Sequence, residues 1–229
     1  MRKELYLLHN GKPLKALIRP YAAADFQGLI DVQKACFPPP FPEELLWNEA
    51  QLSQHVARFP EGALCIEADG RIIGSMTGLI VDYSQYGGEH TWEAITDNGY
   101  IRNHEPGGDT LYVVDIGVIP AYRKSGAGKW LMLTMYETVV HLGLDRLLGG
   151  GRMPGYAAKS DQASPEQYVE NVLSGEWNDP VITFLLRCGR MPLSVARNYL
   201  EDEDSKGNAV IMEWRNPFRH PRQEGLNSC

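Results

Sequence analysis

Short apolar runs along this chain alternate with longer amphipathic segments, and glycine, proline or acidic residues separate them. Runs rich in β-branched and aromatic residues indicate strands, whereas apolar positions recurring every three to four residues indicate helices. The pattern predicts strands over 14–21, 63–68, 72–81, 111–118, 144–148, 194–201 and 209–214. It predicts helices over 25–34, 42–58, 129–142, 165–173 and 180–188.

Two long connections interrupt this regular pattern. The first, at about 83–109, is rich in glycine, histidine, tryptophan and acidic residues, and the second covers about 150–179. Connections of that length inside a compact domain are usually functional. We therefore expect a single domain over 14–214 with two insertions, followed by a disordered tail over 215–229.

The most informative segment is the turn Arg123–Gly128, which joins the apolar strand 111–118 to the helix that follows. A glycine-containing turn at a helix start presents free backbone N–H groups, and the helix dipole adds partial positive charge there. Arg123, Lys124 and Lys129 add three cations. The segment therefore predicts a site for a pyrophosphate.

Two other phosphate-binding loops do not fit this turn. A nucleoside-triphosphate loop requires Ser or Thr after Gly-Lys, but Trp130 follows Lys129. The dinucleotide fingerprint requires a third glycine where Leu131 stands. The remaining pattern, V-x-P-x-x-R-x-x-G-x-G from Val118 to Gly128, resembles the acyl-CoA motif of the GNAT superfamily of N-acetyltransferases.

The resemblance extends over about 14–214 in the order of the expected elements. It implies an α/β (α+β) GNAT fold: a mixed sheet of six to seven strands with four to five helices, splayed around the acyl-CoA site. Neither insertion is part of the core family pattern.

By the same resemblance, the donor is acetyl-CoA, with coenzyme A as product. The backbone of Ile116 and Val118 is expected to bind the pantetheine amides where two strands splay apart. The turn is expected to hold the pyrophosphate through a set of neighbouring residues: Arg123, Lys124, Ser125, Gly126, Ala127, Gly128 and Lys129. Side chains at the two glycines would obstruct the approach of backbone to phosphate.

Acetyl transfer to an amine needs a base, because a free amine holds its proton at neutral pH. Asp115 lies in an apolar strand, where a carboxylate is costly unless it is paired or functional. It is either the base or a structural partner. Glu93 in the first insertion is the second candidate base, and His90 and His104 share that segment.

The chain departs from the family pattern at the residue expected to act as general acid. The tyrosine that protonates the departing thiolate in many members is missing from Asp179–Arg190. Tyr112 and Tyr156 are alternatives that the spacing does not distinguish, and Asp179 stands at a position that contacts the pantetheine arm in the family.

Composition limits the partners. A net charge of −7 argues against nucleic acid, and no segment approaches the roughly 18 apolar residues of a membrane span. Four widely spaced cysteines suggest free thiols in a cytoplasmic protein rather than a disulfide framework or a metal site. The first insertion is strongly acidic. An acidic segment would suit a cationic amine substrate, and the alternative interpretation is a solvated surface loop.

We thus expect an acetyltransferase acting on a primary amine of a small molecule or amino-acid-like acceptor, with a peptide N-terminus and longer acyl groups left open. The alternative is a non-catalytic acyl-CoA sensor. The resemblance also allows a homodimer.

Overall fold

One mixed sheet of eight strands runs through the part of the chain that the computed structural model describes, residues 2–39 and 41–219. The strand order is β1-β2-β3-β4-β5-β6-β8-β7, and every neighbouring pair is antiparallel except β5 and β6. In chain order the strands are β1 (Lys3–His9), β2 (Lys12–Pro20), β3 (Ala63–Ala68), β4 (Arg71–Val81), β5 (Thr110–Val118), β6 (Arg146–Arg152), β7 (Met191–Ala196) and β8 (Ala209–Arg215).

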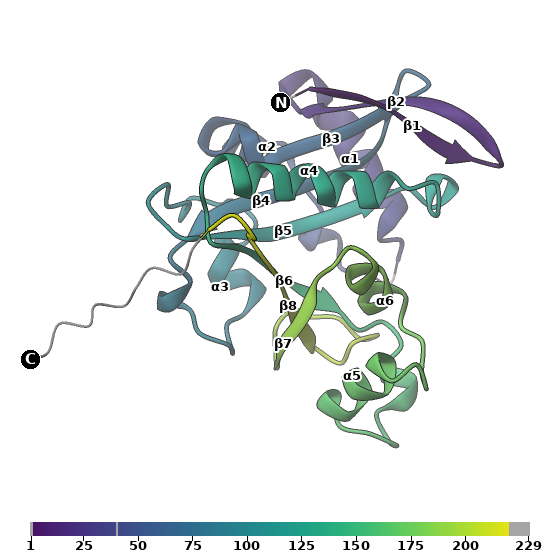
Figure 1. Cartoon of the computed structure of the whole chain (residues 1–229), viewed down its shortest axis with the longest axis vertical. Coiled ribbons are helices and arrows are strands. Elements are labelled where there is room, and N and C mark those ends of the chain that lie inside the picture. The colour runs from purple at the N-terminus through teal and green to yellow at the C-terminus, as the bar shows by residue number, and fades with distance from the viewer. Residues whose placement is uncertain (1, 40, 220–229) are drawn as a thin grey trace, which may run out of the picture.

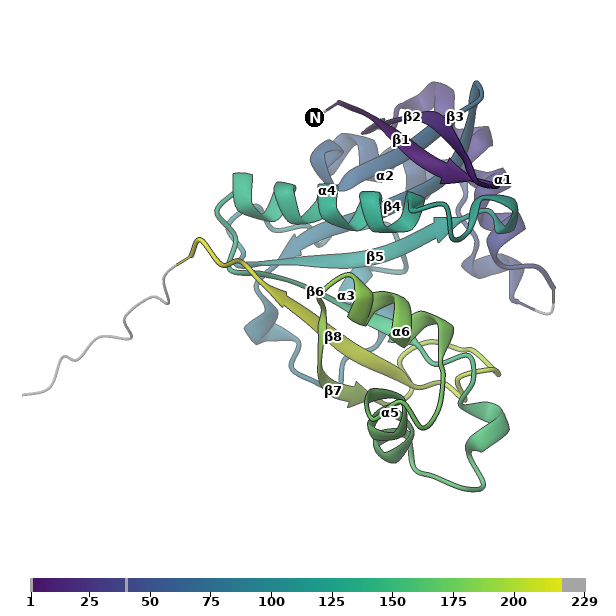
Figure 2. The ribbon, with the colours of Figure 1, turned by 45° about the vertical axis from the view of Figure 1, so that its right-hand side comes forward.

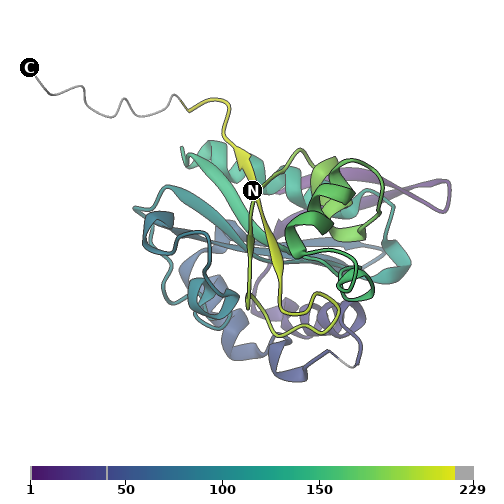
Figure 3. The ribbon, with the colours of Figure 1, turned by 90° about the horizontal axis from the view of Figure 1, so that it is seen from below.

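Six α-helices within these residues flank the sheet: α1 (Phe26–Cys36), α2 (Glu49–Arg58), α3 (Trp92–Thr96), α4 (Ala127–His141), α5 (Pro165–Leu173) and α6 (Pro180–Arg187). Helix α4 crosses the face of the sheet seen in Figure 1, with α1 and α2 behind the sheet. Seen from below, α5 and α6 lie on one side of β8 and α3 on the other (Figure 3). None of the described helices is long and apolar enough to cross a membrane.

The expected α/β (α+β) fold is confirmed, with corrections to the counts of strands and helices. The extra strand is β1, whose buried Leu5 and Leu7 alternate with exposed residues and place it on the edge beside β2. The sheet therefore includes residues before 14. The extra helix is α3, a single short turn within the first insertion.

The predicted tail is partly wrong. Asn216 is buried, and its side chain donates a hydrogen bond to the Leu144 carbonyl at 2.8 Å. This contact holds the chain beyond β8 against the start of β6. Residues 220–229 of the predicted tail lie outside the described residues.

Strand β6 is longer than predicted because it includes Gly149, Gly150 and Gly151, which pair with β8. Their missing side chains leave room for others. A Cβ at Gly150 would lie 2.3 Å from the Tyr199 ring, and one at Gly151 would lie 2.7 Å from Leu185. The glycines are therefore packing positions inside a strand, whereas the predicted strand ended at residue 148.

Replacing Gly150 with alanine tests this packing. The Tyr199 ring is buried and its hydroxyl is bonded to Tyr112, so it has little freedom to move aside. Gly150→Ala should lower the free energy of unfolding in urea by about 1–3 kcal/mol. The control is Gly107→Ala, where no atom lies within 4 Å of the added methyl group. Equal stability of the two variants would contradict the packing role.

Candidate functional site

The central feature is the separation of β5 from β6. The two strands pair in parallel over only three positions, the last joining Tyr112 and Leu148. Beyond that point they diverge, as Figures 1 and 2 show. The carbonyl of Gly149, the next residue of β6, accepts a hydrogen bond from buried Arg190 at 3.0 Å. The guanidinium thus satisfies a backbone group at the point where pairing with β5 ends.

A β-bulge bends β5 at the same level. Thr77 of β4 pairs with Asp115, but the next residue, Gly78, pairs with Val113, so Val114 has no partner in β4. The Val114 carbonyl instead accepts a hydrogen bond from the Trp92 indole at 3.0 Å. Bulges redirect side chains and end regular pairing. Trp92, at the start of α3, therefore anchors the first insertion to the bulge.

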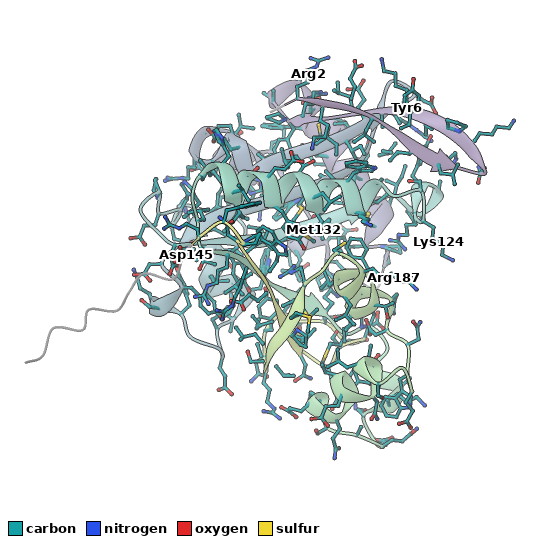
Figure 4. All side chains as sticks on the ribbon, in the orientation of Figure 1. Arg2, Tyr6, Lys124, Met132, Asp145 and Arg187 are labelled. Carbon is teal, nitrogen blue, oxygen red and sulfur yellow. The ribbon has the colours of Figure 1, made fainter. Side chains whose placement is uncertain are left out.

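The turn before α4 has the geometry expected of an anion cradle. Lys124 and Gly126 have φ angles of +63° and +97°, in the left-handed region. Gly126 is the N-cap of α4 and has no side chain to accept from the first turn. The Ala127 N–H donates to the Ser125 hydroxyl at 3.4 Å, and the next N–H groups, those of Gly128 and Lys129, point out of the helix end. Lys124 points outward from this turn (Figure 4), and Arg123 and Lys129 are also exposed.

Ser125 and Gly128 have packing roles within this turn. The buried Ser125 hydroxyl donates to the Tyr122 carbonyl at 2.7 Å. A Cβ at Gly128 would lie 3.2 Å from the Phe184 ring of α6. Gly128 thus allows α6 to pack against the start of α4, a constraint that the sequence did not reveal.

Asp115 points toward α1. Its Oδ2 accepts a hydrogen bond of 2.7 Å from the amide of Gln33, which is itself 3% exposed. Burial raises the pKa of Asp115 to about 7, although the hydrogen bond from Gln33 acts in the opposite direction. A carboxyl with that pKa exchanges its proton near neutral pH.

A chain of buried hydrogen bonds lies next to Asp115. Burial lowers the pKa of His55 to about 4, so its ring is neutral. Nε2 of this ring donates to the Gly99 carbonyl at 2.6 Å, which leaves Nδ1 to accept from the Tyr21 hydroxyl at 2.9 Å. Tyr21 in turn contacts Thr77, the residue opposite Asp115, at 2.9 Å. This chain connects the first insertion to the bulge.

A second buried cluster involves His90, Tyr112 and Tyr199. His90 Nδ1 donates to the Gly87 carbonyl, so Nε2 accepts from the Tyr112 hydroxyl at 2.7 Å. The Tyr112 and Tyr199 hydroxyls are 2.8 Å apart. The cluster lies at the last paired position of β5, where the strands begin to diverge.

Comparison with known proteins identifies the family of this chain. The model of the acetyltransferase (GNAT) family matches residues 26–154. An uncharacterized N-acetyltransferase, YkwB, of Bacillus subtilis (strain 168) is 57% identical over 217 residues, covering 94% of this chain and 96% of the relative. This chain belongs to the GNAT acetyltransferase family.

One further sequence relative and two solved structures are also similar to this chain. A probable hydrolase of Bacillus subtilis (strain 168), YhcX, is 36% identical over 210 residues, but this chain spans only 40% of it. The GNAT-like decarboxylase GphF, solved with isobutyryl-CoA, has a TM-score of 0.68 at 23% identity, covering 87% of this chain and 98% of that one. The loading GNATL domain of CurA from Lyngbya majuscula has a TM-score of 0.71 at 16% identity, covering 89% and 99%. The expected family and enzyme class, an N-acetyltransferase of the GNAT family, are confirmed.

The two predicted bases have different surroundings. Glu93 is exposed in the first turn of α3 and lines a surface cavity of about 640 Å³ that Asp97 and Arg102 also line. Within residues 2–39 and 41–219 no hydrogen bond or ion pair joins it to Asp115. Of the histidines, His90 is part of the buried tyrosine cluster, and His104 Nδ1 accepts the Ile80 N–H.

Asp179 is the N-cap of α6. It is fully buried, and its Oδ1 accepts hydrogen bonds from the N–H groups of Val181 and Ile182. Its Oδ2 accepts from the Tyr168 hydroxyl and the Gly155 N–H. Each carboxylate oxygen of Asp179 thus already accepts two hydrogen bonds within the protein.

The raised pKa of Asp115 predicts a pH effect on stability. The ordinary value is 3.8, so between about pH 4 and about pH 7 the folded protein retains a proton that the unfolded chain has lost. This group therefore destabilises the fold as pH rises through that window. Asp115→Asn should gain unfolding free energy relative to wild type between pH 4 and pH 7, as measured by urea unfolding. A difference that stays constant with pH would contradict burial of the carboxylate.

Proposed function

We propose that this N-acetyltransferase moves the acetyl group of acetyl-CoA to a primary amine of a small molecule or amino-acid-like acceptor. The observation that carries the proposal is the placement of Asp115 beside the point where β5 and β6 separate, on the strand that leads to the turn before α4. Strand β5 thus carries Asp115, the proposed proton acceptor, and leads directly to the turn proposed to bind the pyrophosphate.

The cradle fits a pyrophosphate because its free N–H groups, left-handed backbone and exposed cations all suit an anion. In the proposal, the turn 123–129 holds the pyrophosphate, and the backbone of Ile116 and Val118 binds the pantetheine arm. Acetyl-CoA would supply the activated acetyl thioester.

Asp115 has the geometry of a base. Gln33 holds Oδ2, and Oδ1 accepts no side-chain hydrogen bond within the described part of the chain. Oδ1 is therefore the atom that would take a proton from the acceptor amine. A pKa of about 7 lets the carboxyl take that proton and release it again near neutral pH.

The first insertion supports a small acceptor. Its loop after α3 is attached to α2, because Gln51 donates to the Asn98 carbonyl at 2.8 Å and His55 donates to Gly99. Trp92 fixes the other end to the bulge. The insertion therefore packs on the side of the sheet on which Asp115 lies, which favours a compact acceptor over a protein surface.

Acceptor-dependent release of coenzyme A tests the function and the base together. With a panel of amines, amino acids and short peptides, Asp115→Asn should lower kcat about 10²–10³-fold and leave the Kd for acetyl-CoA unchanged. Glu93→Gln serves as the matched exposed carboxylate and should lose far less. Loss confined to Glu93→Gln would contradict the assignment of the base. Tight binding without release from any acceptor would instead support the sensor.

Two glycines with left-handed backbone conformation flank α4, and replacing each of them tests the proposed pyrophosphate cradle. Gly126 lies before the helix and Gly143, with φ of +65°, lies after it. Gly126→Ala and Gly143→Ala should each lose about 1–2 kcal/mol of stability, because both force alanine into a strained conformation. Only Gly126→Ala should also weaken acetyl-CoA binding, by about tenfold in calorimetry. Equal affinities would contradict the proposed cradle.

A further inference from the structure

The N-terminal hairpin lies against the cofactor turn. Strand β1 is an edge strand, so the N–H groups on its outer side have no partner in the sheet. Leu8 lies opposite Pro13 of β2, which has no N–H. The outward N–H of Leu8 donates a hydrogen bond of 3.1 Å to the carbonyl of Ser125, in the centre of the turn.

Two further contacts join the hairpin to the same region. The His9 ring stacks on the buried Tyr122 ring, with centroids 4.5 Å apart and an interplanar angle of 14°. Lys3 forms an ion pair with Glu137 of α4. The hairpin thus contacts the residues before, within and after the turn.

The hydrogen bond to Ser125 fixes the direction of the next N–H group. The carbonyl of Ser125 and the N–H of Gly126 belong to one peptide unit, and in a trans peptide they point in opposite directions. Because the carbonyl points at Leu8, the N–H of Gly126, the N-cap of α4, points away from β1. Without this bond the peptide could rotate and turn that donor away from a phosphate.

The turn needs such support because its backbone is strained. Lys124 is not a glycine, yet it has a φ of +63°, and Gly126 follows at +97°. Strained conformations persist only where neighbouring structure holds them. Ser125, between these two residues, is held by Leu8 through its carbonyl and by Tyr122 through its hydroxyl.

We propose that β1 is a positioning strand for the cofactor turn, and that the Leu8 N–H orients the Gly126 N–H toward the pyrophosphate of acetyl-CoA. The inference rests on the proposed cofactor site. It adds a specific role for a strand that lies outside the segment matched by the family model, residues 26–154.

Leu8→Pro removes this one donor. The ladder between β1 and β2 should remain, because the Leu8 N–H does not take part in it. The matched control is Tyr6→Pro: Tyr6 is also an outward position of β1, two residues away and 69% exposed, and its N–H has no partner in the turn. Figure 4 shows Tyr6 on the hairpin.

The expected result is specific for the pyrophosphate. Leu8→Pro should raise the KM for acetyl-CoA about tenfold without changing kcat at saturation. It should not change kcat/KM for S-acetylpantetheine, which lacks the pyrophosphate. Tyr6→Pro should behave as wild type with both donors.

Other outcomes overturn the inference in distinguishable ways. An unchanged KM for acetyl-CoA in Leu8→Pro, or an equal loss with both donors, would contradict the positioning role and leave the proposed function intact. Failure of the wild type to bind acetyl-CoA would overturn both. If Leu8→Pro does not fold, His9→Ala decides: removal of the stacked ring should raise the same KM with kcat unchanged, and an unaltered KM would exclude the role.

Discussion

The short pairing between β5 and β6 is the constraint on which the rest of the site depends. Three residue pairs hold the strands together, and beyond Tyr112 and Leu148 each strand must satisfy its backbone elsewhere. Arg190 does part of this on β6 by donating to the Gly149 carbonyl, and Trp92 does part of it on β5 by donating to the Val114 carbonyl. Side-chain donors thus replace part of the β5–β6 pairing on each strand.

The two faces of the separated strands have different chemistry. On one face the turn before α4 offers backbone donors and exposed cations. On the other face Asp115 lies between Gln33 and the hydrogen-bonded chain of Thr77, Tyr21 and His55. The bulge in β5 sets which of its residues point to each face of the sheet. It therefore determines that Asp115 points to the face opposite the turn before α4. In the proposed function, the acyl donor and the acceptor thus approach from opposite sides of one strand.

Local signals allowed part of this arrangement to be predicted. The turn could be predicted because glycine, proline and cations lie close together in the sequence between a strand and a helix. Asp115 could be singled out because it is a carboxylate within an apolar run. Gln33, Tyr21 and His55 could not be found, since their roles arise from tertiary contacts between distant segments. Strand β6 was predicted too short because glycine is rare in strands, and only the fold shows that Tyr199 and Leu185 occupy the space the glycines leave.

Hydrogen exchange with and without acetyl-CoA tests the central claim most directly, because it reports on individual backbone amides. Binding of acetyl-CoA should slow exchange at the amides of the turn 124–129 and at Ile116 and Val118 of β5. The amides of β7, at the far edge of the sheet, should not change. Binding that protects other segments and leaves the turn before α4 unprotected would contradict the account.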